Sequence, residues 1–549
     1  MPASSITGIA SGIDWQSTID ALMEIEGRRK AMLEIRRGDY QAKLSAWQDV
    51  NSKLLQFKTL ADNMDLMGEF LTKSISSSDT DIATATANSS ASSGNFQLEI
   101  NQLARAEKEI HAGWIDFDTT DVNSSGGAQT FVYDFGATTP TTITVSIPDG
   151  STLGDVRDLI NNDSDNPGVN ATIINDGSGG ATAHHLVLTA TDTGADNTIT
   201  ISDTTTLGDG TSFDSAAWTQ TQSGVNAQLR LDGYPPASWM ESASNDVEDI
   251  IEGVTIHLTN VSGGTTVVLS INNDTNTVKS KIQEYIDSYN SCMTLINTYN
   301  YFSEESEERS LLFGDSGLIS IKQKLQTLLS FTIPGLNSNN TLQSLGEIGI
   351  TSGTDGMLAI DDTELSEALA DHFNEVGELF TFNSGTNSSY LDYFYRTENT
   401  QGGEYSVVAN YDGSGNLTSA TIDGHATTIE NNIIVAADGF PEEGLRLRFT
   451  PPGGGAGSET ATIRLSMGVA PEIANRLAII TDSTDGTVTQ QSDHIDTVIE
   501  NLNEQIEDQE YRLALIREKY VRSFTNMELQ LSRLQQQSSY LSSQLASLG

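Results

Sequence analysis

Residues 495–549 read IDTVIENLNEQIEDQEYRLALIREKYVRSFTNMELQLSRLQQQSSYLSSQLASLG, and the apolar residues of this stretch keep coiled-coil spacing. The seam from Ile495 to Leu548 advances by alternating steps of four and three residues, as a left-handed supercoil requires. Two steps of four follow each other at Ile516, Tyr520 and Phe524, which is a stutter that locally unwinds such a supercoil. A continuous helix of this length reaches roughly 80 Å at 1.5 Å per residue. Its apolar edge therefore needs a partner along most of its length.

The apolar positions of this C-terminal seam are our candidates for contact with other molecules. Gly and Pro do not interrupt the seam, so one helix can carry all of these positions. The candidate contact residues are Ile499, Leu502, Ile506, Leu513, Ile516, Tyr520, Phe524, Met527, Leu531, Leu534, Leu541 and Leu545.

A second amphipathic stretch lies near the N-terminus, and Asp14 is the expected N-cap of its helix. The two terminal helices can pair with each other as an intramolecular hairpin, or with helices of neighbouring subunits. The two interpretations are compatible, because pairing within the chain leaves other helix faces free. The candidate contact residues of this stretch are Ile19, Leu22, Leu44, Trp47 and Leu54.

Composition excludes several classes of partner. The 549 residues are too many for one hydrophobic core, so several domains are expected. Lys and Arg total 28 against 75 Asp and Glu, a net charge of −47 that repels nucleic acid and anionic lipid. Thirteen of the 28 basic residues lie in 1–60 or 491–549, so mixed charge flanks the helical ends while the middle is acidic. We expect solubility or adaptation to high salt to explain this acidity.

The single cysteine, Cys292, excludes an internal disulfide framework. It lies on a helical stripe with Ile282, Tyr285, Tyr289 and Ile296, so we expect a small buried side chain rather than a nucleophile. The first residues carry no secretory leader, and no run of about 18 apolar residues could span a bilayer. We therefore expect no membrane insertion, and export without a cleaved signal peptide.

The expected fold class is a multidomain α+β protein with long terminal coiled-coil helices, a helical core and β-rich head domains. We expect an N-terminal helical leg and the start of the core in 1–73, a β-rich head of two subdomains in 74–276, and a helical core domain in 277–383. An inserted β-rich domain is expected in 384–470, and a C-terminal coiled-coil helix that pairs with the N-terminal helix in 471–549.

Two shorter helices are also expected. Residues 152–160, TLGDVRDLI, form a capped helix inside the β-rich head. A later stripe from Leu365 to Phe380 predicts a helix of the core, on which His372 is a partly buried spacer.

The sequence carries no recognisable catalytic or metal-binding motif, and we expect no enzyme activity and no cofactor. The seven histidines are scattered, and His184 and His185 are adjacent on a strand, so they point to opposite faces. Residues 453–457, GGGAG, lack the flanking strand and helix that a dinucleotide site requires. Residues 163–168, DSDNPG, lack the ligand pattern of a calcium-binding loop.

Several motifs together resemble the bacterial flagellar filament cap family, FliD or flagellar hook-associated protein 2. Residues 8–14, GIASGID, are similar to the opening of that family, and residues 94–100, GNFQLEI, to its first head strand. Residues 148–161, PDGSTLGDVRDLIN, resemble a module of cap-protein and flagellin heads. Residues 250–258, IIEGVTIHL, and 345–350, LGEIGI, resemble the C-terminal half of the family.

The resemblance implies a structural protein at the distal tip of the filament, exported through the flagellar channel. Its members form a ring, often of five copies, that retains exported flagellin and promotes its folding and polymerisation. The implied partners are further copies of the chain, flagellin, the hook–filament junction protein, the export apparatus and a chaperone. The terminal helices would be legs that enter the filament.

Two alternatives remain open at the level of sequence. Another flagellar axial protein, such as a junction protein or a flagellin, also has helical termini with apolar contact faces. Residues 250–258 and 345–361 favour the cap over these proteins. A surface adhesin would use an exposed β head to bind a host or a solid surface. A secreted hydrolase on a stalk would need a nucleophile or an acid pair that the sequence does not offer.

Overall fold

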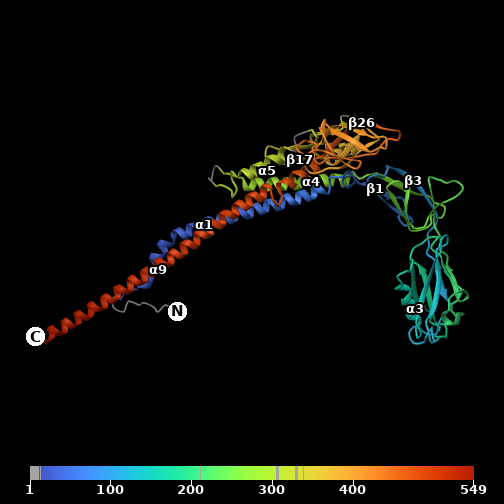
Figure 1. The fold of residues 1–549 in the computed structure, drawn as a ribbon, viewed down its shortest axis with the longest axis horizontal. Helices are drawn as coiled ribbons and strands as arrows, with labels where there is room; N and C mark the ends of the chain where they lie inside the picture. Colours follow the sequence, from blue (N-terminus) through green and yellow to red (C-terminus); the bar gives the residue numbers. More distant parts are fainter. Residues whose placement is uncertain are drawn as a thin grey trace. The chain divides into compact units, whose positions relative to one another are not determined.

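The chain forms two compact units in a computed structural model (Figure 1). Unit 1 joins residues 1–70 to residues 279–549, and unit 2 is the continuous segment 71–278. Most of the family-like opening at residues 8–14 lies outside the described residues. The structure describes residues 12, 14–210, 212–303, 308–327, 332–337 and 339–548.

Unit 2 is built of antiparallel strands around two separate cores. In the first core, a five-stranded sheet of order β1-β15-β3-β11-β12 packs with a three-stranded sheet of order β13-β14-β2. Alternate residues of β14 and β15 are buried, as expected for strands with one face on a core. These strands are β1 (Lys73–Ser77), β2 (Ala83–Ala87), β3 (Gly94–Gln102), β11 (Ala227–Leu231), β12 (Met240–Ser242), β13 (Asp246–Ile251), β14 (Val254–Leu258) and β15 (Val267–Asn273).

The second core of unit 2 contains sheets of order β10-β4-β8-β7 and β6-β5-β9 together with helix α3. The predicted capped helix is confirmed, because α3 begins after Thr152 and a capping box joins Thr152 to Asp155. The elements are β4 (Lys108–His111), β5 (Gln129–Phe135), β6 (Thr141–Ile147), α3 (Leu153–Asn161), β7 (Val169–Asn175), β8 (His184–Ala190), β9 (Ile199–Ile201), η1 (Leu207–Gly210), η2 (Ser215–Ala217) and β10 (Trp218–Gln222).

Unit 1 has a helical core whose central element is α4. The α4 residues Tyr285 and Tyr289 pack edge-on against Phe57 of α1, with ring centroids 5.1 and 6.2 Å apart. Both tyrosine hydroxyls donate to backbone carbonyls, Tyr285 to Val469 at 3.0 Å and Tyr289 to Gly356 at 2.9 Å. The core elements are α1 (Trp15–Asp62), α2 (Met67–Phe70), α4 (Thr275–Tyr299), α5 (Ser316–Thr327), η3 (Leu345–Ile348), β16 (Ile350–Ser352), β17 (Leu358–Ile360), α6 (Asp362–Asp371), α7 (Phe373–Phe380) and α8 (Val469–Ile480).

The single helix predicted from Leu365 to Phe380 is wrong, because the structure has two helices there. His372 ends α6 and precedes α7 with φ −131° and ψ 37°, which is not a helical conformation. Its imidazole lies 3.3 Å from the Glu375 carboxylate. The apolar spacing survives the break because Phe373, Val376 and Phe380 are still buried, so periodicity alone could not reveal it.

A β-rich segment follows α7 and has its own apolar core. Sheets of order β18-β26-β20-β21-β22 and β19-β25-β24-β23 enclose that core. The long strand β26 leads into α8, which returns the chain to the helical core. The strands are β18 (Phe382–Thr386), β19 (Leu391–Tyr395), β20 (Gly403–Tyr411), β21 (Leu417–Ile422), β22 (His425–Ala426), β23 (Thr428–Glu430), β24 (Ile433–Val435), β25 (Arg446–Phe449) and β26 (Gly457–Met467).

The last helix, α9 (Thr487–Leu548), has 62 residues and lies beside the 48-residue α1 (Figure 1). Asp14 caps α1 as predicted, because its carboxylate accepts hydrogen bonds from the backbone N–H groups of Gln16 and Ser17. Among the described residues, no helix has a stretch long and apolar enough to cross a membrane. The structure thus confirms a mixed α+β protein with long terminal helices. The finer division of the chain into five domains stays a prediction.

The aromatic cluster around α4 generates a stability prediction. Phe57→Ala removes a fully buried ring from the unit 1 core, so we expect a loss of about 3–5 kcal/mol in the free energy of unfolding. The neighbouring Leu55 is 42% exposed, and Leu55→Ala should change that free energy by only about 0.5 kcal/mol. Urea denaturation followed by helical circular dichroism checks both values. Equal effects of the two substitutions would contradict the described packing.

Candidate functional site: the terminal helix pair

The terminal helices α1 and α9 run antiparallel. Lys30 contacts Glu510 at 2.7 Å, and Arg517 contacts Asp20 at 3.0 Å. Further along, Trp15 stacks on Phe524 with ring centroids 4.7 Å apart. Residues that rise in number along α1 therefore meet residues that fall in number along α9. The predicted intramolecular pairing of the two termini is confirmed.

The charged contacts along the pair add little stability, because their side chains are exposed to solvent. The hydrogen bond from Lys30 to Glu510 raises the pKa of the Lys30 ammonium group. Arg37 donates to the Asn503 side-chain oxygen at 3.2 Å, which is a polar contact between the two helices beside the seam. These contacts set the register of the pair, while apolar burial supplies most of the attraction.

Burial of the predicted contact residues falls along α9 toward its C-terminal end. Leu534, Leu541 and Leu545 are 59%, 60% and 71% exposed. Five predicted contact residues are buried (Ile19, Trp47, Leu54, Leu502 and Ile506), eight are partly buried (Leu22, Leu44, Ile499, Leu513, Ile516, Tyr520, Phe524 and Leu531), and four are exposed (Met527, Leu534, Leu541 and Leu545).

The five buried residues pack inside this chain, so they are not accessible to another molecule in this conformation. The exposed part of the seam begins where α1 begins. Trp15, the first residue of α1, meets Phe524 and donates a hydrogen bond to Glu528. Beyond this point α9 continues to Leu548, and its apolar seam positions Leu534, Leu541 and Leu545 are exposed, while Leu531 is partly buried. The stutter at Ile516, Tyr520 and Phe524 coincides with the end of the pairing.

Trp15 is a seam residue that the sequence analysis missed. It extends the seam of α1 by one step of four residues before Ile19, a spacing that could have revealed it. It is buried although it lies at the very start of the helix, directly after the Asp14 cap. Its indole lies at the end of the part of the seam that is paired between α1 and α9.

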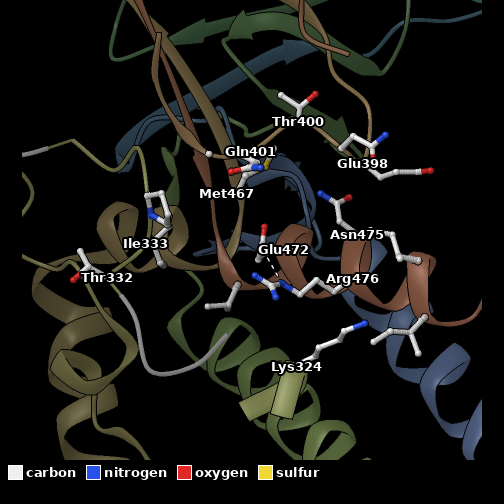
Figure 2. Close-up of a pocket in the computed structure, with 16 residues that line it drawn as sticks. Lys324, Thr332, Ile333, Glu398, Thr400, Gln401, Met467, Glu472, Asn475 and Arg476 are labelled. Carbon is white, nitrogen blue, oxygen red and sulfur yellow. Dashed lines mark hydrogen bonds and ion pairs between the residues drawn. The ribbon is translucent and has the colours of Figure 1, made fainter. Parts of the chain in front are cut away.

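A cavity in unit 1 is the second candidate site. It has a volume of about 590 Å³ and lies between α5, α8 and the loop before β20 (Figure 2). Lys324 reaches it from α5, Thr400 and Gln401 line it from the loop, and Glu472 pairs with Arg476 on α8 at 2.9 Å. Its described lining includes no histidine, cysteine or serine, and its Glu472 carboxylate is engaged by Arg476.

The remaining reactive groups are also arranged for packing. Cys292 is buried, its thiol lies 3.5 Å from the Lys53 carbonyl oxygen, and burial raises its pKa to about 12. This confirms the expected small buried side chain. Within the described parts of the chain, no three His, Cys, Asp or Glu side chains converge as metal ligands would.

The fold and the helix pair together define a class of protein, a mixed α+β chain with long paired terminal helices and β-rich segments. The sequence model described as flagellar hook-associated protein 2 C-terminus matches residues 224–536, more than half of the chain. The corresponding N-terminus model matches residues 11–107, and a flagellin hook IN motif matches residues 134–192. The chain belongs to the flagellar hook-associated protein 2 family.

Individual relatives agree with this assignment. The A-type flagellar hook-associated protein 2 of Pseudomonas aeruginosa is 29% identical over 413 residues, which cover 70% of this chain and 81% of the relative. The flagellar hook-associated protein 2 of Escherichia coli K12 is 29% identical over 396 residues, which cover 69% and 80%. The crystal structure of the flagellar cap protein FliD D1-D2-D3 domains from Escherichia coli shares the fold, with a TM-score of 0.57. That likeness covers 82% of this chain and 99% of the other at 23% identity.

Family membership supplies the general function. This is a family of structural cap proteins that act at the tip of the flagellar filament, outside the cell. Its members oligomerise and interact with flagellin.

The unequal burial along α9 yields a paired prediction. Leu502→Ala removes a buried side chain and should lower the free energy of unfolding by about 2–5 kcal/mol. Leu541→Ala removes an exposed side chain and should change that free energy by about 0.5 kcal/mol or less. Urea denaturation of the two purified variants measures the difference. A loss at Leu541 as large as that at Leu502 would show that the end of α9 is covered within the chain.

Proposed function

We propose that copies of this chain form a ring at the distal tip of the filament, with the exposed end of α9 as the part that enters the filament. The observation that supports this proposal is the exposed apolar seam of Met527, Leu534, Leu541 and Leu545, which continues a seam that is buried closer to the core. An apolar helical edge of this length in water gains free energy by packing against further helices. Flagellin and neighbouring copies of the chain are the proposed partners.

The same seam suits a contact that must form and release repeatedly as flagellin subunits are inserted. Its positions include Ser538 among larger apolar residues, and Gln509 occupies a position in the part of the seam that pairs with α1. Polar residues at core positions lower the stability of a coiled coil while they restrict its register. We propose that this gives the exposed end of α9 a moderate affinity for the filament. Such an affinity holds the cap in place and still lets it release when a flagellin subunit is inserted.

The β-rich domains then form a lid over the growing end that retains exported flagellin and promotes its folding. We propose a ring of about five copies by analogy with the family pattern. The proposal also includes export of the chain through the flagellar channel with a chaperone. It further includes docking on the hook–filament junction protein before the filament grows. A chain with one cysteine suits such a route, since no internal disulfide can impede passage of the unfolded chain.

Deletion of residues 529–549 tests the role of the exposed seam. We expect the truncated chain to keep its free energy of unfolding, because the deleted residues are mostly exposed. We also expect the truncated chain not to assemble at the filament tip. A strain that carries the truncation should release most of its exported flagellin into the medium unpolymerised and should lose swimming. The measurements are flagellin content of the culture supernatant and the diameter of swimming halos.

The control for this deletion is Leu529→Ala, which changes an exposed leucine that lies off the seam. It should leave both readouts at the wild-type level. Normal filaments in the truncated strain would overturn the proposal. A full gene deletion that swims normally but loses adhesion would favour the adhesin instead.

A further inference from the structure

The sheet β19-β25-β24-β23 has one face on the apolar core of its segment and a second, outer face directed away from that core. On β25, Leu447 and Phe449 are buried in the core. Successive residues of a strand point to opposite faces, so Arg446 and Arg448 lie on the outer face. Two arginines are thus neighbours on one side of a single strand.

A bulge in the neighbouring strand β19 brings aromatic side chains to the same face. The register with β25 shifts between Tyr393 and Tyr395, which leaves Phe394 as an extra residue. The guanidinium of Arg448 lies over the Phe394 ring, 4.6 Å from its centroid, and Tyr395 is opposite Arg446. Phe394 is 41% exposed and Tyr395 is 52% exposed. The outer face therefore presents two aromatic rings beside two arginines.

This composition is typical of a protein–protein contact, because aromatic residues and arginine are enriched at such interfaces. Arg446 contacts the Glu430 carboxylate at 3.1 Å, and both side chains are solvent-exposed. Arg448 forms no ion pair within the described part of the chain. Its guanidinium can therefore still donate two hydrogen bonds to a carboxylate of another molecule.

The outer face also lacks the negative excess of the rest of the protein. Its arginines are balanced by Asp392 and Glu430, whereas the whole chain has 75 acidic residues against 28 basic ones. Two copies of the chain, each with a net charge of −47, repel one another at long range. A face without excess charge is where a second copy can approach with the least repulsion.

A complementary surface exists on helix α6 of the same unit. Glu364, Glu367 and Asp371 are exposed and follow each other at steps of three and four, so they share one side of the helix. Leu365 and Leu369 bury the other side. None of the three carboxylates forms an ion pair with a described residue. Like charges at these spacings destabilise a helix, and a basic partner would relieve that repulsion.

We propose that the outer face of β19 and β25 in one copy docks on the acidic side of α6 in a neighbouring copy. Arg446 and Arg448 pair with the α6 carboxylates, and Phe394 and Tyr395 supply the apolar area of the contact. The two surfaces are different patches of unit 1, so the contact is heterologous, and such contacts generate rings when the rotation closes. The inference rests on the ring proposed above and assigns one of its subunit contacts.

Sedimentation velocity of the full-length protein tests this contact. The wild type should associate in low salt and dissociate in about 1 M NaCl, which screens exposed charges beyond about 3 Å. Arg448→Glu should raise the dissociation constant about tenfold or more, because it places like charges together. The matched control is Arg464→Glu on β26, in the opposite sheet of the same segment, which should associate like the wild type. Helical circular dichroism confirms that each variant folds.

A charge swap tests the identity of the partner surface. Glu367→Arg alone should weaken association about as much as Arg448→Glu. The chain that carries both substitutions should associate more tightly than either single variant, because the reversed charges meet again across the contact. Absence of this rescue would overturn the assignment of α6.

The remaining outcomes separate this contact from the ring itself. Oligomers of the Arg448→Glu variant with wild-type affinity would overturn the contact and leave the proposed ring intact. A wild type that stays monomeric in every salt concentration would overturn the ring, and the contact with it. An Arg448→Glu variant that forms normal oligomers but no longer binds purified flagellin would also overturn the contact, since the face would then belong to flagellin.

Discussion

The antiparallel contact between α1 and α9 is the interaction on which the rest of the structure depends. It brings the two ends of a 549-residue chain together and closes unit 1 around α4. Because α1 begins at its Asp14 cap and has 48 residues, it cannot cover the 62 residues of α9. Since Trp15 at the start of α1 meets Phe524 and Glu528, the part of α9 beyond Glu528 has no partner in α1. The seam therefore has two environments, buried near the core and exposed near the end. An internal stabilising contact and an exposed apolar edge are thus made from the same periodic sequence.

The Trp15–Phe524 stack marks the change between these environments. Up to this stack, aromatic and aliphatic side chains of both helices share the seam. Beyond it, the stutter gives the remaining residues a new phase along the helix. Such a change of phase suits a different set of neighbours, as a leg that leaves its own subunit and enters a filament would meet. The contact surface that we propose is therefore a continuation of the fold.

Unit 2 differs from the helix pair in where its charged side chains lie. Its cores are made of short strands with alternating burial, and most of its acidic residues remain on the surface. Glu107 and Glu109 are the exception, because the strand alternation directs both into the interior. A protein with a net charge of −47 has few basic side chains to place beside them.

The sequence by itself determined the helical ends, the Asp14 and Thr152 caps, the buried state of Cys292 and the family. These features depend on local spacing and capping, which neighbouring residues in the chain control. Only the tertiary structure decided which part of the seam is covered, since coverage depends on where another helix begins. The break at His372 escaped prediction because a kinked pair of helices buries the same apolar positions as one straight helix. The pairing of Glu109 with Gln220 lies between strands 111 residues apart, a distance over which no local pattern carries information.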